Sequence, residues 1–149
     1  MSRNTDEVIQ SLYHQLIKAW NERDAAGMAS HFSDEGVQIG FDGSTLTGKN
    51  EIHSHLEAIF SNNATPPFLT KITKVRKLGD DAAILHAIAG MVPPGSSDIN
   101  PELNAHQTLV AVLRNNNWEI ELFQNTPAQY HGRPELVEQM TEDLKRAQK

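Results

Sequence analysis

The hydrophobic residues of this chain change their spacing between its first and second halves. Near the start, apolar residues recur every three or four positions, the period of a helix that buries one side. They are Val8, Ile9, Leu12, Tyr13, Leu16, Ile17 and Trp20. Asn4 and Glu7 form the pattern of a capping box for this helix. Asp24 suits the start of a second, short helix, and residues 49–60 predict a third.

Alternation with a period of two, which is typical of strands, begins at Val37, Ile39 and Phe41. Asp42-Gly43 is a hairpin signal, after which residues 45–47 pair back. In the second half we expect four strands, over residues 69–78, 82–91, 104–114 and 118–124. Turn residues or a proline-containing loop separate these strands. Pro134 opens a last helix.

This order of elements predicts one α+β domain over residues 1–149. Its core covers about residues 5–128, and residues 134–147 form a C-terminal helical extension. Helices followed by an antiparallel meander favour a cone-shaped, curved antiparallel sheet wrapped around the N-terminal helices. A ligand would sit at the open end of this cone.

Composition narrows the classes of function. The chain has no cysteine, which excludes disulfides, zinc–thiolate sites and cysteine nucleophiles. Its formal charge of -6 disfavours binding to a phosphate backbone. No apolar stretch approaches the length of a membrane span, and the first residues carry no apolar core of a secretion signal. We therefore expect a cytoplasmic protein with no nucleic-acid partner and no membrane contact.

Motifs for nucleotides and metals are weak. Residues 43–50 nearly match the phosphate-binding loop GxxxxGK[ST], but Asn50 replaces the magnesium-binding hydroxyl and the βαβ alternation is missing. Seven histidines invite a metal interpretation, yet His53 and His55 sit two apart on a helix and point in different directions. No HExxH pattern occurs. We predict no metal site and no cofactor.

The run from Trp118 to Pro127 is the most informative segment. Strict alternation places Trp118, Ile120, Leu122 and Gln124 on one face, and Glu119, Glu121, Phe123 and Asn125 on the other. A strand that sets Phe123 beside Asn125 can line a pocket with an apolar wall and a few polar groups. The plainer interpretation is an edge strand whose polar face meets water.

Three titratable residues are candidates for acid–base chemistry. His86 and His106 lie on expected strands among aliphatic neighbours. There a histidine is either a satisfied core residue or, in a partly dry pocket, a general acid or base. Glu121 is the carboxylate best placed to join them if its face is the inner one, where burial would raise its pKa. The favoured interpretation for Glu121 is an exposed edge position. Our choice for the acid or base is His86, with His106 and Glu121 as alternatives.

Four segments match the motifs of a known family. Residues 20–25 with Phe32 resemble an opening W-N-x-x-D-A and F, and Gly48 with Ile52 and Phe60 resembles a G-x-x-x-I helix. Val75 and residues 81–87 resemble a valine-rich strand that ends V-H-A, and residues 118–127 resemble a closing W-x-I-x-x-F-Q-N-T-P. Over about residues 8–128 the chain is similar to the SgcJ/EcaC group of the SnoaL-like, nuclear-transport-factor-like (cystatin-like) superfamily.

The resemblance implies a cone-shaped α+β fold, a homodimer and a pocket in the cone. In one place the chain departs from its relatives, which often carry a histidine four residues before the phenylalanine that matches Phe60. Here that residue is Leu56, with His53 and His55 nearby. Members of the group are often labelled oxidoreductases, and the wider superfamily includes isomerases, dehydratases, cyclases, epoxide hydrolases and proteins that only bind or assemble. The fold therefore does not decide the function.

Two functions are compatible with these observations. We favour a protein that binds a small, largely apolar molecule in the cone pocket. The sequence leaves open whether it also performs cofactor-independent acid–base chemistry of the isomerase, cyclase or dehydratase type. The alternative is a non-catalytic ligand-binding or dimerisation module. The residues expected to line the pocket are Trp20, Phe41, His86, Phe123 and Asn125. Asn125 would orient a polar ligand atom, because a carboxamide both donates and accepts.

We also expect a homodimer. The helices can cover only one face of the sheet, while large apolar side chains occur on both. The uncovered face, expected to carry Trp118, Ile120 and Leu122, would then be the interface.

Overall fold

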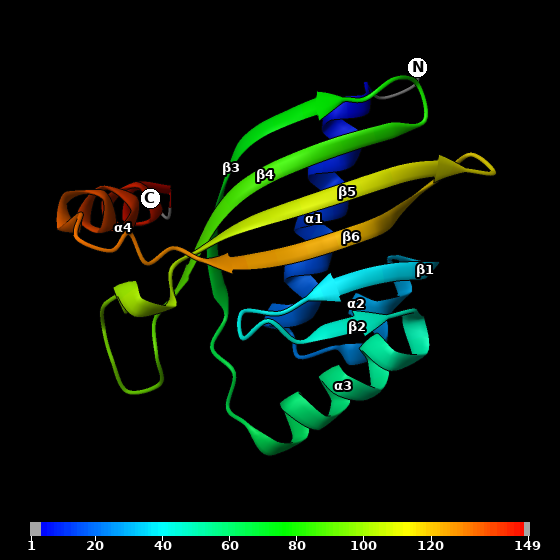
Figure 1. Ribbon diagram of the computed structural model, residues 1–149. Coiled ribbons are helices and arrows are strands. Elements are labelled where there is room, and N and C mark those ends of the chain that lie inside the picture. Colours follow the sequence, from blue (N-terminus) through cyan, green and yellow to red (C-terminus); the bar gives the residue numbers. More distant parts are fainter. Residues whose placement is uncertain (1–3, 148–149) are drawn as a thin grey trace.

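Six strands form one curved, unclosed sheet in the order β2-β1-β6-β5-β4-β3 (Figure 1). The computed structural model describes residues 4–147. Residues 1–3 lie outside the described part; they belong to the start of the chain, whose polar character led us to expect a cytoplasmic location. The strands are β1 (Phe32–Ile39), β2 (Thr45–Thr47), β3 (Phe68–Lys77), β4 (Ala82–Met91), β5 (Ala105–Arg114) and β6 (Asn117–Pro127). The helices are α1 (Thr5–Asn21), α2 (Ala25–Ser30), α3 (Lys49–Asn62) and α4 (Pro134–Ala147), with a 3-10 turn η1 (Pro101–Leu103).

The predicted α+β class, with N-terminal helices on one side of a curved sheet and a C-terminal helix, is confirmed. One pairing differs from the expected antiparallel meander, because β1 runs parallel to β6. The chain reaches β6 only after α3 and four further strands, so no short turn forces the two strands to be antiparallel. β1 also begins at Phe32, earlier than the alternation from Val37 indicates.

The core lies between α1 and the face of the sheet that α1 covers, here called the inner face. Ile9, Tyr13 and Leu16 of α1 are fully buried, as are Leu85 of β4 and Leu109 of β5. Their spacing of three and four on the helix and of two on the strands brings both sets to one boundary. Figure 1 shows α1 behind the sheet, so the opposite, outer face points toward the viewer.

A bulge in β6 changes which side chains of the last strand share a face, contrary to the prediction. Val110 pairs with Leu122, but Ala111 pairs with Ile120, which leaves Glu121 as an extra residue. Beyond a bulge the alternation of faces shifts by one residue. Ile120 and Phe123 are therefore both buried in the core under α1, and Trp118 packs against the same core. The expectation that Trp118 and Ile120 share a face with Leu122 is wrong.

α4 covers one end of the outer face. Met140 and Leu144 are buried with Ile88 of β4 and Ile99 of the following loop. Gly90 permits this contact, since a Cβ atom there would lie 2.8 Å from Leu144 Cδ1. Within residues 4–147, no helix combines the length and the apolar character that a bilayer crossing requires.

Candidate functional site

A cavity of about 290 Å³ lies on the inner side of the sheet, near the C-terminal ends of β1 and β6. Its volume is just below the range of about 300–1,000 Å³ for small-molecule sites. Most of the wall is apolar and comes from Trp20, Met28, Phe41, Ile59, Phe68, Met91, Leu103 and Phe123. Four polar or charged side chains complete it: Gln38, Asp42, His55 and Asn125.

The last turn of α1 fixes the aromatic side of the cavity. Trp20 donates its indole N–H to the carbonyl of Pro66 over 3.1 Å, and its ring lies against Phe60 and Phe68. The guanidinium of Arg23 donates to the carbonyls of Phe60 and Asn63. Because its polar atom has a partner elsewhere, Trp20 offers the cavity an apolar surface held in one place.

A chain of hydrogen bonds leads from the core to the cavity. The buried Tyr13 hydroxyl donates to Gln107 Oε1, and Gln107 Nε2 donates to Asn125 Oδ1 over 2.8 Å. Burial raises the pKa of Tyr13 well above its usual range, opposed in part by a hydrogen bond with Thr70. The hydroxyl therefore keeps its proton and remains a donor. Asn125 Oδ1 is thus occupied, and its amide nitrogen has no hydrogen-bond partner among residues 4–147.

Gln38 brings a second amide to the cavity. It pairs with Phe123 in the β1–β6 register and therefore lies on the inner face. Its side chain is 7% exposed and its Oε1 is buried with no hydrogen-bond partner within the described chain. Buried polar atoms in folded proteins nearly always have partners, so an unpartnered amide beside a cavity is an informative exception.

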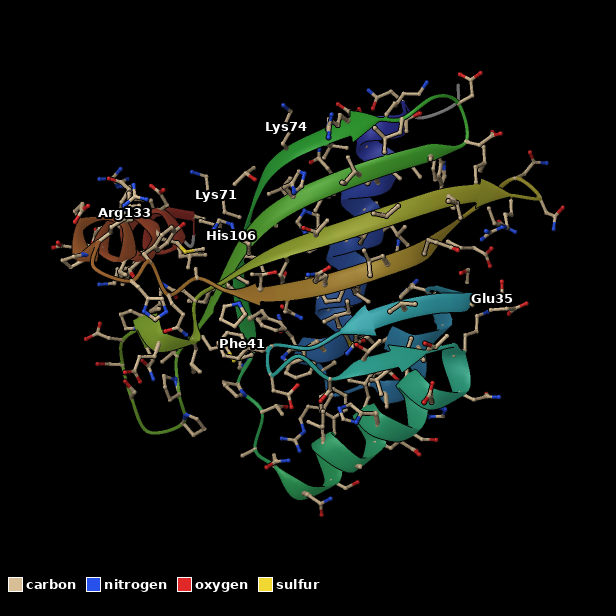
Figure 2. All side chains as sticks on the ribbon, in the orientation of Figure 1. Glu35, Phe41, Lys71, Lys74, His106 and Arg133 are labelled. Carbon is tan, nitrogen blue, oxygen red and sulfur yellow. The ribbon has the colours of Figure 1, made fainter. Side chains whose placement is uncertain are left out.

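The mouth of the cavity carries its titratable groups. Asp42 follows β1 and is exposed; a hydrogen bond from the Ser44 backbone lowers its pKa, and the nearby His55 contributes to the same shift. His55 reaches the cavity from α3. Phe41, 38% exposed, forms the apolar rim next to Asp42 and is labelled in Figure 2.

Four of the five residues expected in the pocket lie together at this cavity: Trp20, Phe41, Phe123 and Asn125. The expectation that His86 joins them is wrong. Leu85 and Ala87 of β4 are in the core, so His86 between them points to the outer face, opposite Thr108 of β5. His106 is also on the outer face, where its Nε2 lies 3.0 Å from the Tyr130 hydroxyl.

Glu121, the third acid–base candidate, sits at the β6 bulge away from the cavity. Its Oε1 accepts hydrogen bonds from Arg114 Nη1 at 3.0 Å and Ser33 Oγ at 2.7 Å. The bond from Arg114 is the main reason that the pKa of Glu121 is lowered, and the bond from Ser33 adds to it. Of the two environments considered for Glu121, a buried site with a raised pKa and an exposed edge position, the first is wrong, because the carboxylate is paired rather than isolated in an apolar pocket.

Sequence reasoning missed Gln38, His55 and the Tyr13–Gln107 pair. One signal was present: Gln107 occupies a position of β5 that alternates with the buried residues Ala105 and Leu109. A polar residue in such a series needs a buried partner. A tyrosine on the apolar stripe of the first helix, Tyr13, could have supplied it.

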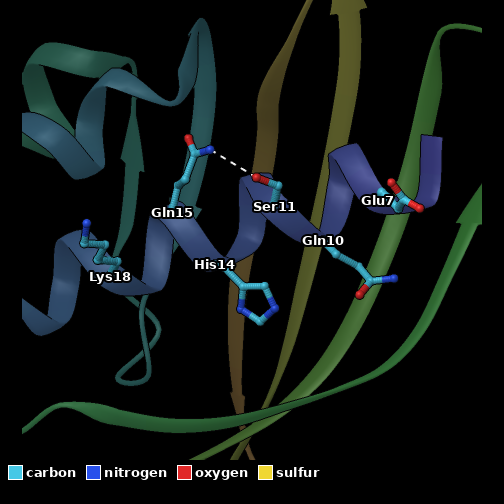
Figure 3. A pocket seen from close by; sticks show the side chains of 6 residues that line it. All are labelled: Glu7, Gln10, Ser11, His14, Gln15 and Lys18. Carbon is cyan, nitrogen blue, oxygen red and sulfur yellow. Dashed lines mark hydrogen bonds between the residues drawn. The ribbon is translucent and has the colours of Figure 1, made fainter. Parts of the chain in front are cut away.

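A second hollow follows the exposed side of α1 (Figure 3). Its lining side chains are polar and almost all exposed: Glu7, Gln10, Ser11, His14, Gln15 and Lys18. Gln15 donates to Ser11 over 3.2 Å, as neighbours one turn apart do on a solvated helix. This hollow has no buried polar group. Across residues 4–147, no three histidine, aspartate or glutamate side chains converge as metal ligands would.

The profile of the SnoaL-like domain matches residues 9–128. The chain belongs to this family. The matched SnoaL-like domain contains most of α1, the whole sheet and every residue that lines the cavity, and it ends before α4. No curated protein gives a significant sequence match.

Solved structures agree with this SnoaL-like assignment at the level of the fold. A domain of unknown function with a cystatin-like fold from Nostoc punctiforme PCC 73102 has a TM-score of 0.82 at 21% identity, covering 93% of this chain and 86% of that one. A ketosteroid isomerase-like protein from Erwinia carotovora atroseptica SCRI1043 has a TM-score of 0.70 at 15% identity, covering 85% and 99%. A putative calcium/calmodulin-dependent protein kinase type II association domain from Thiobacillus denitrificans ATCC 25259 has a TM-score of 0.72 at 15% identity, covering 80% of this chain and 94% of that one.

Proposed function

We propose that this protein binds a small, largely apolar molecule in the cavity between α1, α3 and the sheet. The observation that carries the proposal is the cavity itself: aromatic side chains line its wall but leave about 290 Å³ of space inside. A cone filled by its own aromatic residues would instead favour a module that only assembles. The SnoaL-like fold and the ketosteroid isomerase-like neighbour are compatible with this role.

Acid–base chemistry of the isomerase, cyclase or dehydratase type is the second candidate. Its support is now His55, which lines the cavity, rather than His86, His106 or Glu121, which lie outside it. An imidazole side chain that reaches a substrate is the commonest general acid or base in enzymes. Substrate turnover that persists after His55→Gln would argue against this role. We also infer membership of the SgcJ/EcaC group from the closing motif at residues 118–127.

Filling the cavity tests the binding proposal. Gly40 lines the cavity, and a Cβ atom at this position would lie 3.4 Å from its nearest neighbour, Asp42 Oδ1. Gly40→Leu should therefore fold but occupy the space a ligand needs. The probe is N-phenyl-1-naphthylamine, an uncharged dye that fluoresces in apolar sites. We expect saturable binding by the wild type and at least roughly tenfold weaker binding by Gly40→Leu, as for a ligand that loses its pocket.

Gly40→Ala is the matched control, because it adds one methyl group and leaves most of the cavity open. It should bind the dye nearly as well as the wild type. Equal dye binding by Gly40→Leu and Gly40→Ala would place the dye elsewhere and contradict the proposal.

We propose in addition that the outer face forms a homodimer. Register places four apolar residues in one row across the sheet, Val37, Leu122, Val110 and Ile84. In the part of the chain that the structure describes, no helix covers this row, since α4 packs at the ends of β3 and β4 and against η1 (Figure 1). A contiguous apolar surface of this kind usually marks an interface.

Charge favours a second copy as the occupant of this face. Lys71 and Lys74 lie at the β3 edge, whereas Glu35 lies at the start of β1, on the opposite side of the sheet (Figure 2). Packing two copies about a two-fold axis can bring the basic edge of one protomer to the acidic end of its partner. Such complementarity fixes the orientation of two protomers.

A further inference from the structure

The amide of Gln38 lies at the cavity and has no hydrogen-bond partner among the described residues. Its Oε1 is enclosed by protein atoms, whereas its Nε2 is neither enclosed nor hydrogen-bonded among residues 4–147. Since Gln38 is only 7% exposed and lines the cavity, we infer that its N–H₂ group points into the cavity. A side chain held in this place with no hydrogen bond of its own points to a partner from outside the chain.

The second amide, of Asn125, also presents its nitrogen. Tyr13 can only donate to Gln107 Oε1 in this arrangement, so Gln107 turns its nitrogen toward Asn125. Asn125 must then accept through Oδ1, and its own N–H₂ group remains for the cavity. The protonated Tyr13 thus sets the direction of the whole chain of bonds. Asn125 lies two residues beyond Phe123, the partner of Gln38, which is roughly 7 Å along the strand.

We propose that Gln38 and Asn125 form a two-donor subsite for an uncharged carbonyl group, an inference that rests on the proposed binding function. Both groups donate, so the matching ligand atom is an acceptor, and a carbonyl oxygen has two lone pairs. Among the described residues the wall contains no lysine or arginine, and its one histidine, His55, lies at the mouth near the carboxylate of Asp42. A buried carboxylate needs a cation or several charged partners. The ligand class is therefore a ketone, lactone, quinone or amide on a small apolar body.

Two probes of the same shape test whether the cavity recognises a carbonyl group or only an apolar shape. Acetophenone and α-methylstyrene have nearly the same shape, but the first carries C=O where the second carries C=CH₂. Their affinities are measured by displacement of N-phenyl-1-naphthylamine from the wild-type protein. We expect acetophenone to bind at least about tenfold more tightly, the effect of hydrogen bonds made in a dry site. Benzoate, with a charged carboxylate, should bind more weakly than acetophenone.

Variants of the two amides test which residues provide the preference. In Gln38→Met and Asn125→Leu the ratio of the two affinities should fall toward one, because each variant removes a donor. The affinity for α-methylstyrene should stay within about twofold, since the apolar wall is unchanged. If one variant does not fold, the ratio of the two affinities in the wild type and in the other variant still tests the carbonyl subsite.

Failure of the inference and failure of the proposed function look different. Equal affinities of the wild type for acetophenone and α-methylstyrene would overturn the carbonyl subsite while leaving an apolar binding cavity. Benzoate binding as tightly as acetophenone would overturn the uncharged class. An absence of dye binding and of any displaceable probe would overturn the proposed function, and the inference with it.

Discussion

Single residues in this protein act through the partners that the fold gives them. Glu121 was a candidate base on the strength of its strand, but its carboxylate accepts from Arg114 and Ser33. These bonds stabilise the charged form, so the pKa of Glu121 is lowered. Its role is to tie β6 to the start of β1 and the end of β5. The same residue type in an apolar pocket would have the opposite shift.

The lowered pKa of Glu121 makes a prediction about acid stability. A carboxyl group with a folded pKa below its unfolded value stabilises the fold above the unfolded pKa, and this contribution is lost as the pH falls through the folded pKa. Glu121→Gln should therefore lower the urea midpoint at pH 7, and the difference from wild type should shrink toward pH 3. Glu119→Gln is the control, because Glu119 lies 3.8 Å from the same Arg114 and should have a smaller effect. A difference that grows on acidification would contradict the assignment.

At the level of elements, two irregular strands fit each other. The register of β1 against β6 shifts between Phe32 and Val37, and β6 carries its extra residue at Glu121. Gly36 lies within the shift, and a Cβ atom there would be only 2.7 Å from the carbonyl oxygen of Ile120. The close approach of the two backbones thus requires a glycine. It also directs Gln38 and Phe123 to the same face, where they line the cavity.

Gly36→Ala should destabilise the protein. The nearest atom to the new methyl group belongs to backbone, which cannot rotate away, so β1 or β6 must shift. Overpacking of this kind costs about 1–3 kcal/mol, and we expect a loss of that order in the free energy of unfolding measured with urea. Gly40→Ala, on the same side of the sheet with ordinary contact distances, should change stability much less. Equal stability of both variants would show that the strands need no close approach at Gly36.

At the scale of the whole molecule, the two faces of the sheet are covered differently. The inner face packs on α1 and, at one end, leaves the cavity. The outer face is covered by α4 only at the ends of β3 and β4, and its row of apolar residues has no partner within the described chain. Dimer formation through this face would leave the cavity on the opposite side free for a ligand.

A charge in the apolar row should separate the protomers. Val110 lies between Leu122 and Ile84 in the row, so Val110→Asp would bury a carboxylate in the proposed interface, which is strongly unfavourable without a partner. Sedimentation at micromolar concentration should show a dimer for the wild type and a monomer for Val110→Asp. Leu78→Asp, which replaces an exposed leucine at the β3–β4 turn, is the control and should remain dimeric. A monomeric wild type would refute the proposed dimer.

The sequence by itself determined the elements and their order. Periods of three to four and of two, with caps and turn residues, located the helices and most of the strands, because these signals depend on neighbours within a few positions. The closing motif at residues 118–127 indicated the family from local residues. Trp20, Phe41, Phe123 and Asn125, which were expected to line a pocket, all line the cavity. For Phe123 and Asn125 the signal was local, since an aromatic residue next to a placed amide on one strand is typical of a pocket wall.

Only the tertiary structure decided which face each side chain occupies. One extra residue at Glu121 reverses the alternation of β6, and Leu85 and Ala87 of β4 turn inward, which leaves His86 outside. The hydrogen-bond partner of Tyr13 is Gln107, on a strand far along the chain. Gln38 Oε1 has no partner among the described residues. No local sequence pattern indicates either fact. The physical reason is that alternation fixes only the relative orientation of neighbours. The choice of the buried face depends on the packing of segments that meet only after folding.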